Sequence, residues 1–125
     1  MIALDASALL ALLFRETGHA QVAAAVSEAC LSAVNLCEVL GRFCRDGHDV
    51  HAVASRLLRQ RIEVVAFTDD HAALAAALRL RTDALGLSLG DRACLALAQA
   101  RQIPAMTADR AWQHLDVGVQ VLLIR

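Results

Sequence analysis

The sequence predicts an α/β domain with a mostly parallel central sheet flanked by helices. Apolar segments typical of strands alternate with helix-like segments along the chain, and this order is typical of a parallel sheet covered by helices. The chain has 125 residues, a usual size for one domain, and shows neither an internal repeat nor a linker. We therefore expect residues 1–125 to form a single domain.

The first elements follow from short apolar runs and from residues that begin helices. Ile2 to Leu4 is a strand candidate, and Ala6 to Phe14 has helix-favouring residues. A second helix is expected from Thr17-Gly18 to about Glu28. Leu31 to Ala33 is either a short strand or a turn, and the pattern does not separate the two.

The segment from Val34 to Arg45 is predicted to be an amphipathic helix that ends at Asp46-Gly47. One stripe is apolar and contains Leu36, Leu40 and Phe43. The other stripe is polar and contains Asn35, Glu38, Arg42 and Arg45.

The second half of the chain continues the alternation of helices and strands. Thr68-Asp69 is a good helix cap, Gly86 is a helix stop, and the lone Pro104 fits a strand only near its start or on an edge. The expected elements are a helix from His51 to Gln60, a strand from Ile62 to Phe67, a helix from Asp69 to about Leu85, a helix from Ser88 to Gln102, and strands from Ile103 to Thr107 and from Val119 to Ile124.

Composition excludes several classes of protein. With 58% hydrophobic residues and a net charge of -1, the chain is expected to fold rather than to be disordered. Asp5 interrupts the first apolar stretch, so no signal peptide is expected, and no uncharged run is long enough for a membrane span. We expect a cytoplasmic protein without membrane contact.

Cysteine and lysine usage narrows the chemistry. Cys30, Cys37, Cys44 and Cys94 form no CxxC pair, and we expect them to pack in the core as free thiols. All 12 basic residues are arginine, which excludes a P-loop and Schiff-base chemistry because both need a lysine. The absence of lysine also weighs against a phospho-receiver domain.

Four carboxylates indicate where chemistry could occur. Asp5 follows the first strand and Asp109 follows the strand that ends at Thr107, so both should lie at the carboxyl edge of a parallel sheet, where ligands bind. Glu38 and Asp91 lie in or at the start of helices. Clustered acids repel one another unless a cation binds them, and Mg²⁺ prefers carboxylate oxygens, water and substrate phosphates. This pattern favours metal-assisted chemistry on a phosphate.

Each acid also has a purely structural explanation. Asp5 could cap the helix that begins at Ala6, and Asp109 could cap the turn that follows it. Ser88-x-x-Asp91 matches a capping box, and Glu38 with Arg42 is an i,i+4 pair. The four acids have to be considered together, in their order and spacing.

Taken together, these motifs resemble the PIN-domain nucleases, and among them the small VapC-type toxins of toxin–antitoxin pairs. The resemblance rests on Asp5 with Ser7, on Ser32 and Asn35 before Glu38, on LSLGDRACLALA around Asp91, and on MTADRAW with Thr107 and Asp109. It implies an endoribonuclease that depends on Mg²⁺ or Mn²⁺. The implied catalytic residues and metal ligands are Asp5, Glu38, Asp91 and Asp109, and the implied supporting polar residues are Ser7, Asn35 and Thr107.

The same resemblance implies partners. It implies an RNA substrate, a homodimer and a cognate antitoxin that inhibits the site, and we expect an apolar groove beside the acids that receives a partner helix. Many relatives are basic overall, whereas this chain has a net charge of -1. Two alternatives stay open at this point, namely a PIN-domain nuclease of RNA maturation and a PIN-like binding module that cleaves nothing.

Overall fold

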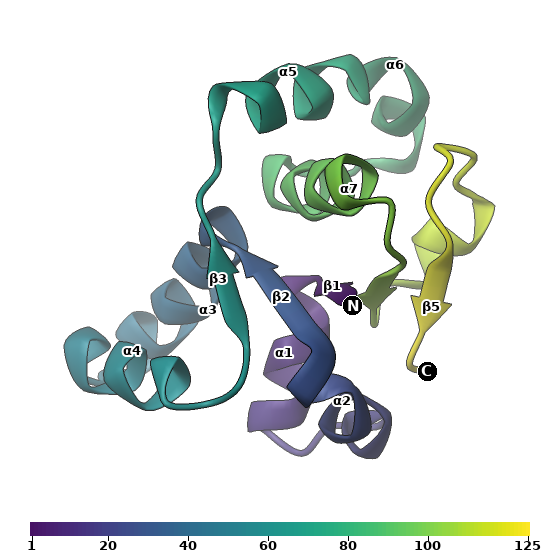
Figure 1. Cartoon of the computed structure of the whole chain (residues 1–125). Helices are drawn as coiled ribbons and strands as arrows, with labels where there is room; N and C mark the ends of the chain where they lie inside the picture. The colour runs from purple at the N-terminus through teal and green to yellow at the C-terminus, as the bar shows by residue number, and fades with distance from the viewer.

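The chain folds into one five-stranded sheet with helices on both faces (Figure 1). The computed structural model describes all 125 residues. The strand order is β3-β2-β1-β4-β5, and every neighbouring pair is parallel, which confirms the expected α/β class. The strands are β1 (Ile2–Leu4), β2 (Ala29–Ser32), β3 (Glu63–Val65), β4 (Ala105–Thr107) and β5 (Val121–Leu123).

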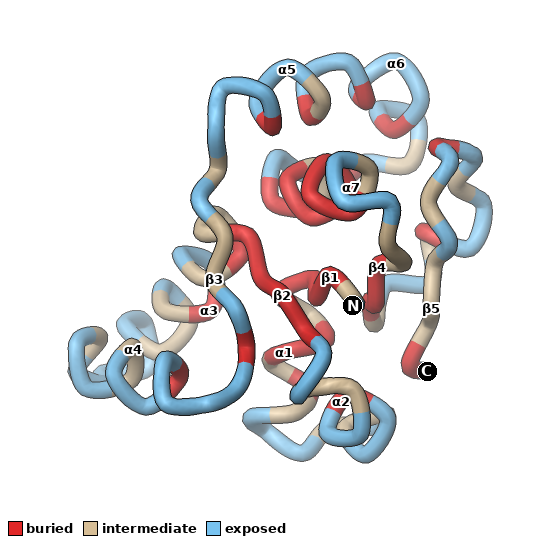
Figure 2. Tube along the Cα trace, viewed as in Figure 1, coloured by how far each residue is buried: buried red, intermediate tan, exposed pale blue.

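Successive residues of the inner strands pack into different cores, one on each side of the sheet. Leu4 and Met106 belong to one buried cluster, whereas their neighbours Ala3 and Ala105 belong to the other. Side chains on a strand point alternately to its two faces, so a sheet covered on both faces needs apolar residues at every position. Figure 2 shows β1, β2 and β4 buried along most of their length.

The helices divide between the two cores. The first cluster is covered by α1 (Ala6–Leu13), α2 (His19–Ala25), α3 (Ala33–Arg45) and α4 (Val50–Leu58). The second is covered by α5 (Asp69–Ala77), α6 (Arg79–Thr82) and α7 (Leu89–Arg101), with fully buried Trp112. Three short 3₁₀ turns complete the fold, η1 (Val26–Glu28), η2 (Asp83–Leu85) and η3 (Arg110–His114). None of these helices has the length and apolar content needed to cross a lipid bilayer.

Two expected helices are interrupted. The helix expected from 17 to 28 consists of α2 followed by η1. The helix expected from 69 to 85 divides into α5, α6 and η2, and Gly86 ends it with a φ of 70°. At this division the buried Thr82 hydroxyl donates to the Leu78 carbonyl at 2.9 Å, a contact that competes with regular helix geometry. The ambiguous segment at 31–33 is resolved, because Ala29–Ser32 is strand β2.

The polar stripe of α3 contains one buried residue, and the i,i+4 pair considered for Glu38 does not form. Asn35 is fully buried and donates hydrogen bonds inside the protein instead of facing solvent. Arg42 pairs with Asp46 at 3.4 Å, at the C-terminal end of the helix, and not with Glu38. The reason is that α3 packs against both α1 and α7, so that the face carrying Asn35 and Val39 is enclosed.

The cysteines follow the prediction only in part. All four are free thiols, as expected. Cys30 and Cys94 are buried in strand β2 and helix α7, whereas Cys37 and Cys44 are exposed on α3. The expectation of core packing is wrong for the second pair, because the helix face that Cys37 and Cys44 share, through their seven-residue spacing, is not the face that packs on the core.

The strand order creates one topological switch point. From β1 the chain adds β2 and β3 on one side, and then crosses to add β4 and β5 on the other side. At such a point, connections leave the sheet in opposite directions and open a crevice outside the carboxyl ends of the strands. In this protein the switch point lies where β1 and β4 end, next to Asp5 and Thr107.

Candidate active site

Asp5 occupies the switch point directly after β1. Its backbone N–H continues the sheet by donating to the Met106 carbonyl at 2.9 Å. Although Asp5 precedes helix α1, its side chain makes no capping hydrogen bond, so the simple structural explanation for this acid does not apply. The residue is only 3% exposed. A buried carboxylate at the carboxyl edge of the sheet is costly unless its surroundings compensate the charge.

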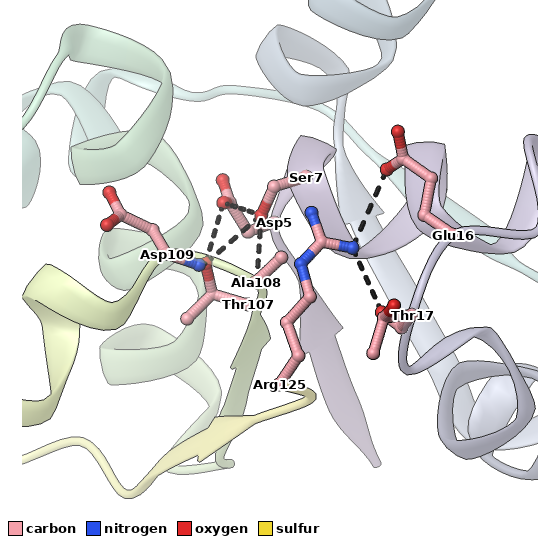
Figure 3. A network of polar contacts seen from close by, with 8 residues as sticks. All are labelled: Asp5, Ser7, Glu16, Thr17, Thr107, Ala108, Asp109 and Arg125. Atoms are coloured by element: carbon pink, nitrogen blue, oxygen red, sulfur yellow. Dashed lines mark hydrogen bonds and ion pairs between the residues drawn. The ribbon is translucent and has the colours of Figure 1, made fainter.

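Two hydroxyl groups compensate Asp5 in part (Figure 3). Ser7 Oγ donates to Asp5 Oδ2 at 2.7 Å, and Thr107 Oγ1 donates to the same oxygen at 2.9 Å. The two hydroxyls are held in turn, because the Ala108 N–H donates to Ser7 and the Asp109 N–H donates to Thr107, each at 3.0 Å. The network fixes the carboxylate and leaves its Oδ1 without a protein donor.

A second group of polar residues joins α3 to the start of α7. Asn35 Nδ2 donates to Glu38 Oε1 and to the Gly90 carbonyl, both at 2.9 Å. Asn35 is fully buried, and its own Oδ1 has no hydrogen-bond partner. The carboxylate of Glu38 lies directly against Gly90, at a position that a Cβ on residue 90 would occupy. Glu38 is therefore held at the junction of two helices.

Asp91 has both a structural role and a place in the site. Its carboxylate accepts from the Ser88 N–H at 2.9 Å, while the Ser88 hydroxyl accepts from the Asp91 N–H, which forms a capping box. The capping box proposed from the sequence is confirmed. A carboxylate in the first turn also interacts favourably with the helix dipole.

Asp109 lies closer to the protein surface than Asp5 does. It follows Thr107 at the end of β4, but its carboxylate accepts from the Ala111 N–H at 2.9 Å and caps η3. The residue is exposed, and Figure 3 shows it beyond Thr107 as seen from Asp5. Of the four predicted acids, Glu38 and Asp91 lie close enough to influence the pKa of Asp5, whereas Asp109 does not figure among its causes.

The electrostatics identify the same three acids as one group. The pKa of Asp5 is raised to about 6, first because burial disfavours its charged form and also because Asp91 and Glu38 repel it, while the Ser7 and Thr107 hydroxyls oppose the rise. The pKa of Glu38 is raised as well, by burial and by Asp91, against the hydrogen bond from Asn35. The charges that act on Asp5 come from helices α3 and α7, distant in sequence.

The donor set fits a hard divalent cation. The available atoms are carboxylate oxygens, the ligand type of Mg²⁺ and Mn²⁺, and a cation at the Oδ1 of Asp5 would relieve the repulsion that raises its pKa. No group of three or more His, Cys, Asp or Glu side chains is already gathered closely enough to hold a metal ion. Asp91 and Asp109 instead use their carboxylates for local capping contacts.

One residue of this site was missed by sequence reasoning. Gly90 has no chemistry of its own, yet its missing side chain gives Glu38 its position. The signal was a glycine in the first turn of a helix, immediately before Asp91. Glycine is a poor helix former, so its presence there indicated a need for close approach.

The fold and the candidate site define a single-sheet α/β protein with a buried carboxylate, Asp5, at its switch point. The chain belongs to the PIN-domain family, because the model of the PIN domain matches residues 2–118. The family resemblance drawn from the sequence is confirmed. No curated protein sequence matches the chain.

Several solved structures share the fold. A chain of a toxin–antitoxin complex from Klebsiella pneumoniae is 20% identical in sequence. The match covers 100% of this chain and 98% of the Klebsiella chain, with a TM-score of 0.78. DNA-bound VapBC from Salmonella typhimurium is 16% identical, with coverages of 99% and 98% and a TM-score of 0.73. VapC20 from Mycobacterium tuberculosis, a toxin that cleaves the sarcin-ricin loop, is 22% identical, with coverages of 96% and 99% and a TM-score of 0.72.

Proposed function

We propose that this protein is an endoribonuclease dependent on Mg²⁺ or Mn²⁺ that acts as the toxin of a type II toxin–antitoxin pair. The observation that carries the proposal is the buried Asp5 at the carboxyl end of β1, whose Oδ2 is held by the hydroxyls of Ser7 and Thr107. Burial raises its pKa, and the charges of Asp91 and Glu38 raise it further. Structural neighbours that include toxin–antitoxin complexes and an RNA-cleaving toxin support the choice of substrate and role.

The proposed mechanism assigns a task to each acid. A metal ion bound here would polarise the scissile phosphate and lower the pKa of a bound water. Ser7 and Thr107 hold Oδ2 of Asp5, so Oδ1 is the atom that would bind the ion. Asp91 and the outer Asp109 would supply the further ligands. Glu38 would bind the ion or accept a proton from the attacking water, and its raised pKa suits a proton acceptor.

The proposed antitoxin binds along α3. One apolar groove is lined mainly by small and apolar residues of this helix, namely Ala33, Leu36, Cys37, Leu40, Gly41 and Cys44, with Val50 from α4. An adjoining groove shares Ala33 and Cys37 and reaches Glu38 and Gly90. A partner helix in the first groove could place an Arg or Lys against the acids. Such a segment would inhibit by competing for the metal or the phosphate.

The test of activity is cleavage of total cellular RNA by the purified protein with and without Mn²⁺, followed by mapping of the new ends. We expect cleavage that needs the metal and produces a limited set of ends. Wild-type protein that is folded and leaves RNA intact at every Mn²⁺ concentration would refute the nuclease proposal and favour a PIN-like binding module.

The test of the toxin role is growth of the native host. Expression of the chain alone should stop growth, co-expression of a gene encoded beside it should restore growth, and Asp5→Asn should be harmless without that gene. A wild-type chain that cleaves RNA yet does not affect growth would replace the toxin role with RNA maturation.

A further inference from the structure

We infer that Gly90 is a positioning residue for Glu38, and that Gly90 and Asn35 together form a seat that holds the Glu38 carboxylate at the N-terminus of α7, within reach of a metal ion at Asp5. This inference deepens the proposed function and rests on it for the metal. The seat itself is a packing relationship, so it can be tested without any metal or RNA.

The first observation is the space left by the missing side chain. A Cβ on residue 90 would overlap the Oε1 and Cδ atoms of Glu38. Both atoms belong to the end of a flexible side chain, and Gly90 itself is a helical residue without a positive φ. Its backbone therefore tolerates alanine, and what alanine displaces is the carboxylate of Glu38.

The second observation is the hydrogen bonding around this space. Asn35 divides its two N–H donors between Glu38 Oε1 and the Gly90 carbonyl, both at 2.9 Å. The side chain is fully buried and its Oδ1 accepts no hydrogen bond, so the donors govern its orientation. Asn35 thus connects the carboxylate of Glu38, on α3, to the first turn of α7.

The third observation is the position of the seat relative to the other acids. Gly90 immediately precedes Asp91, and Asp91 is among the charges that raise the pKa values of both Glu38 and Asp5. Moving Glu38 off Gly90 therefore changes the distance between acids that share the site. Residues that orient metal ligands in this way typically contribute about 10- to 100-fold to metal affinity or activity.

Gly41 provides a matched control for measurements on the protein alone, since the groove that it lines is the one proposed for the antitoxin, which these measurements leave out. It also lies inside a helix, α3, with no positive φ, and a Cβ there would meet no atom within 4 Å. Gly90→Ala and Gly41→Ala thus make the same chemical change, and both gain helix propensity. Only the first substitution displaces a carboxylate.

The first experiment compares the increase in melting temperature that Mn²⁺ causes in wild type, Gly90→Ala and Gly41→Ala. We expect Gly90→Ala to fold and to need about 10-fold more Mn²⁺ for the same increase, whereas Gly41→Ala responds like wild type. An equal Mn²⁺ response in Gly90→Ala and Gly41→Ala would overturn the inference. The kcat of RNA cleavage should be lower for Gly90→Ala than for wild type and unchanged for Gly41→Ala. The KM for RNA should change less than kcat.

The second experiment is a double-mutant cycle with Gly90→Ala and Glu38→Ala, followed by denaturant unfolding in the presence of a chelator. In the Glu38→Ala background no carboxylate is displaced, so Gly90→Ala should stabilise the protein more than it does in wild type. Additive effects would mean that Glu38 does not rest on Gly90 and would overturn the inference. If the cycle is non-additive but Mn²⁺ stabilises no variant, the seat exists and the metal-dependent function fails instead.

Discussion

Thr107 Oγ1 donates a 2.9 Å hydrogen bond to Asp5 Oδ2, and so connects the carboxyl ends of two neighbouring parallel strands across 102 residues of sequence. Ser7 donates to the same oxygen from the first turn of α1. The two hydroxyls therefore decide which oxygen of Asp5 faces a ligand. Four of the five predictions below depend on this carboxylate or on the acids beside it.

The first prediction concerns pH and the metal-free protein. Because the pKa of Asp5 is raised from 3.8 to about 6, the folded state retains this proton over a pH range in which the unfolded state has lost it. Below about pH 4 both states are protonated and the stability is fully present; it falls as pH rises to about 6, by about 3 kcal/mol in total. Asp5→Asn removes this effect.

The measurement is the difference in unfolding free energy between Asp5→Asn and wild type, followed from acid to neutral pH with a chelator present. We expect Asp5→Asn to become relatively more stable as pH rises through this window. A difference that stays constant would show that folding does not change the pKa of Asp5, and a change in favour of wild type would show that folding lowers it; either result would contradict the prediction.

The second prediction concerns Thr107→Val, which replaces the hydroxyl by a methyl group of similar size. The substitution removes a donor to a buried carboxylate, and such a loss costs about 1–3 kcal/mol. It should raise the pKa of Asp5 further, since that hydrogen bond lowers it. The check is carbonyl NMR titration of Asp5 in both proteins, and an unchanged or lower pKa would contradict the network.

The third prediction concerns metal binding at Asp91. An ion that binds only the native protein adds about 2.7 kcal/mol of stability at about 100 times its dissociation constant. Mn²⁺ should therefore raise the melting temperature of wild type more than that of Asp91→Asn. Asn can still accept the Ser88 N–H of the capping box, so the metal-free stabilities should be similar. If Mn²⁺ raised the melting temperatures of wild type and Asp91→Asn equally, Asp91 would not be a ligand of the ion.

The fourth prediction concerns the connection between α1 and α2. Gly18 has a φ of 94°, and a Cβ there would overlap the Ile124 carbonyl; Arg125 also holds this segment by donating to the Thr17 carbonyl at 2.9 Å (Figure 3). Gly47 has a φ of 88° but open space around it. Gly18→Ala should therefore destabilise the protein by more than the roughly 1–2 kcal/mol of backbone strain expected for Gly47→Ala. Similar losses in thermal unfolding would argue against the contact with Ile124.

The class of fold was predictable because it depends on patterns that a sequence displays directly. The apolar runs of β1 and β4 end in Asp5 and near Asp109, and parallel topology then places both ends on one edge of the sheet. The positions at which helices are interrupted were harder to predict from the sequence. The interruption between α5 and α6 coincides with the contact of Thr82 with Leu78, which the sequence does not distinguish from an ordinary helical threonine.

Motifs in the sequence predicted the acids of the candidate site, namely Asp5, Glu38, Asp91 and Asp109, but not the contacts that hold them. Asp109, for example, uses its carboxylate to cap η3. Asn35 is buried because α3 packs against α7. The residue pattern of α3 alone does not predict which other helix covers it. Gly90 contributes by lacking a side chain where the Glu38 carboxylate lies. This contact joins two helices that are distant in sequence, so the sequence alone does not show it.

The central claim is that Asp5 belongs to a metal-dependent site that cleaves RNA, and its most direct test is the single-turnover cleavage rate of one RNA in Mn²⁺ by wild type, Asp5→Asn and Asp116→Asn. Asp116 is an exposed acid whose side chain makes no hydrogen bond, so its variant controls for the loss of one charge. We predict that Asp5→Asn stays folded and loses about 100-fold or more in rate, the effect of about 2.7 kcal/mol on the barrier, while Asp116→Asn cleaves like wild type. A folded Asp5→Asn that cleaves at the wild-type rate would contradict the account.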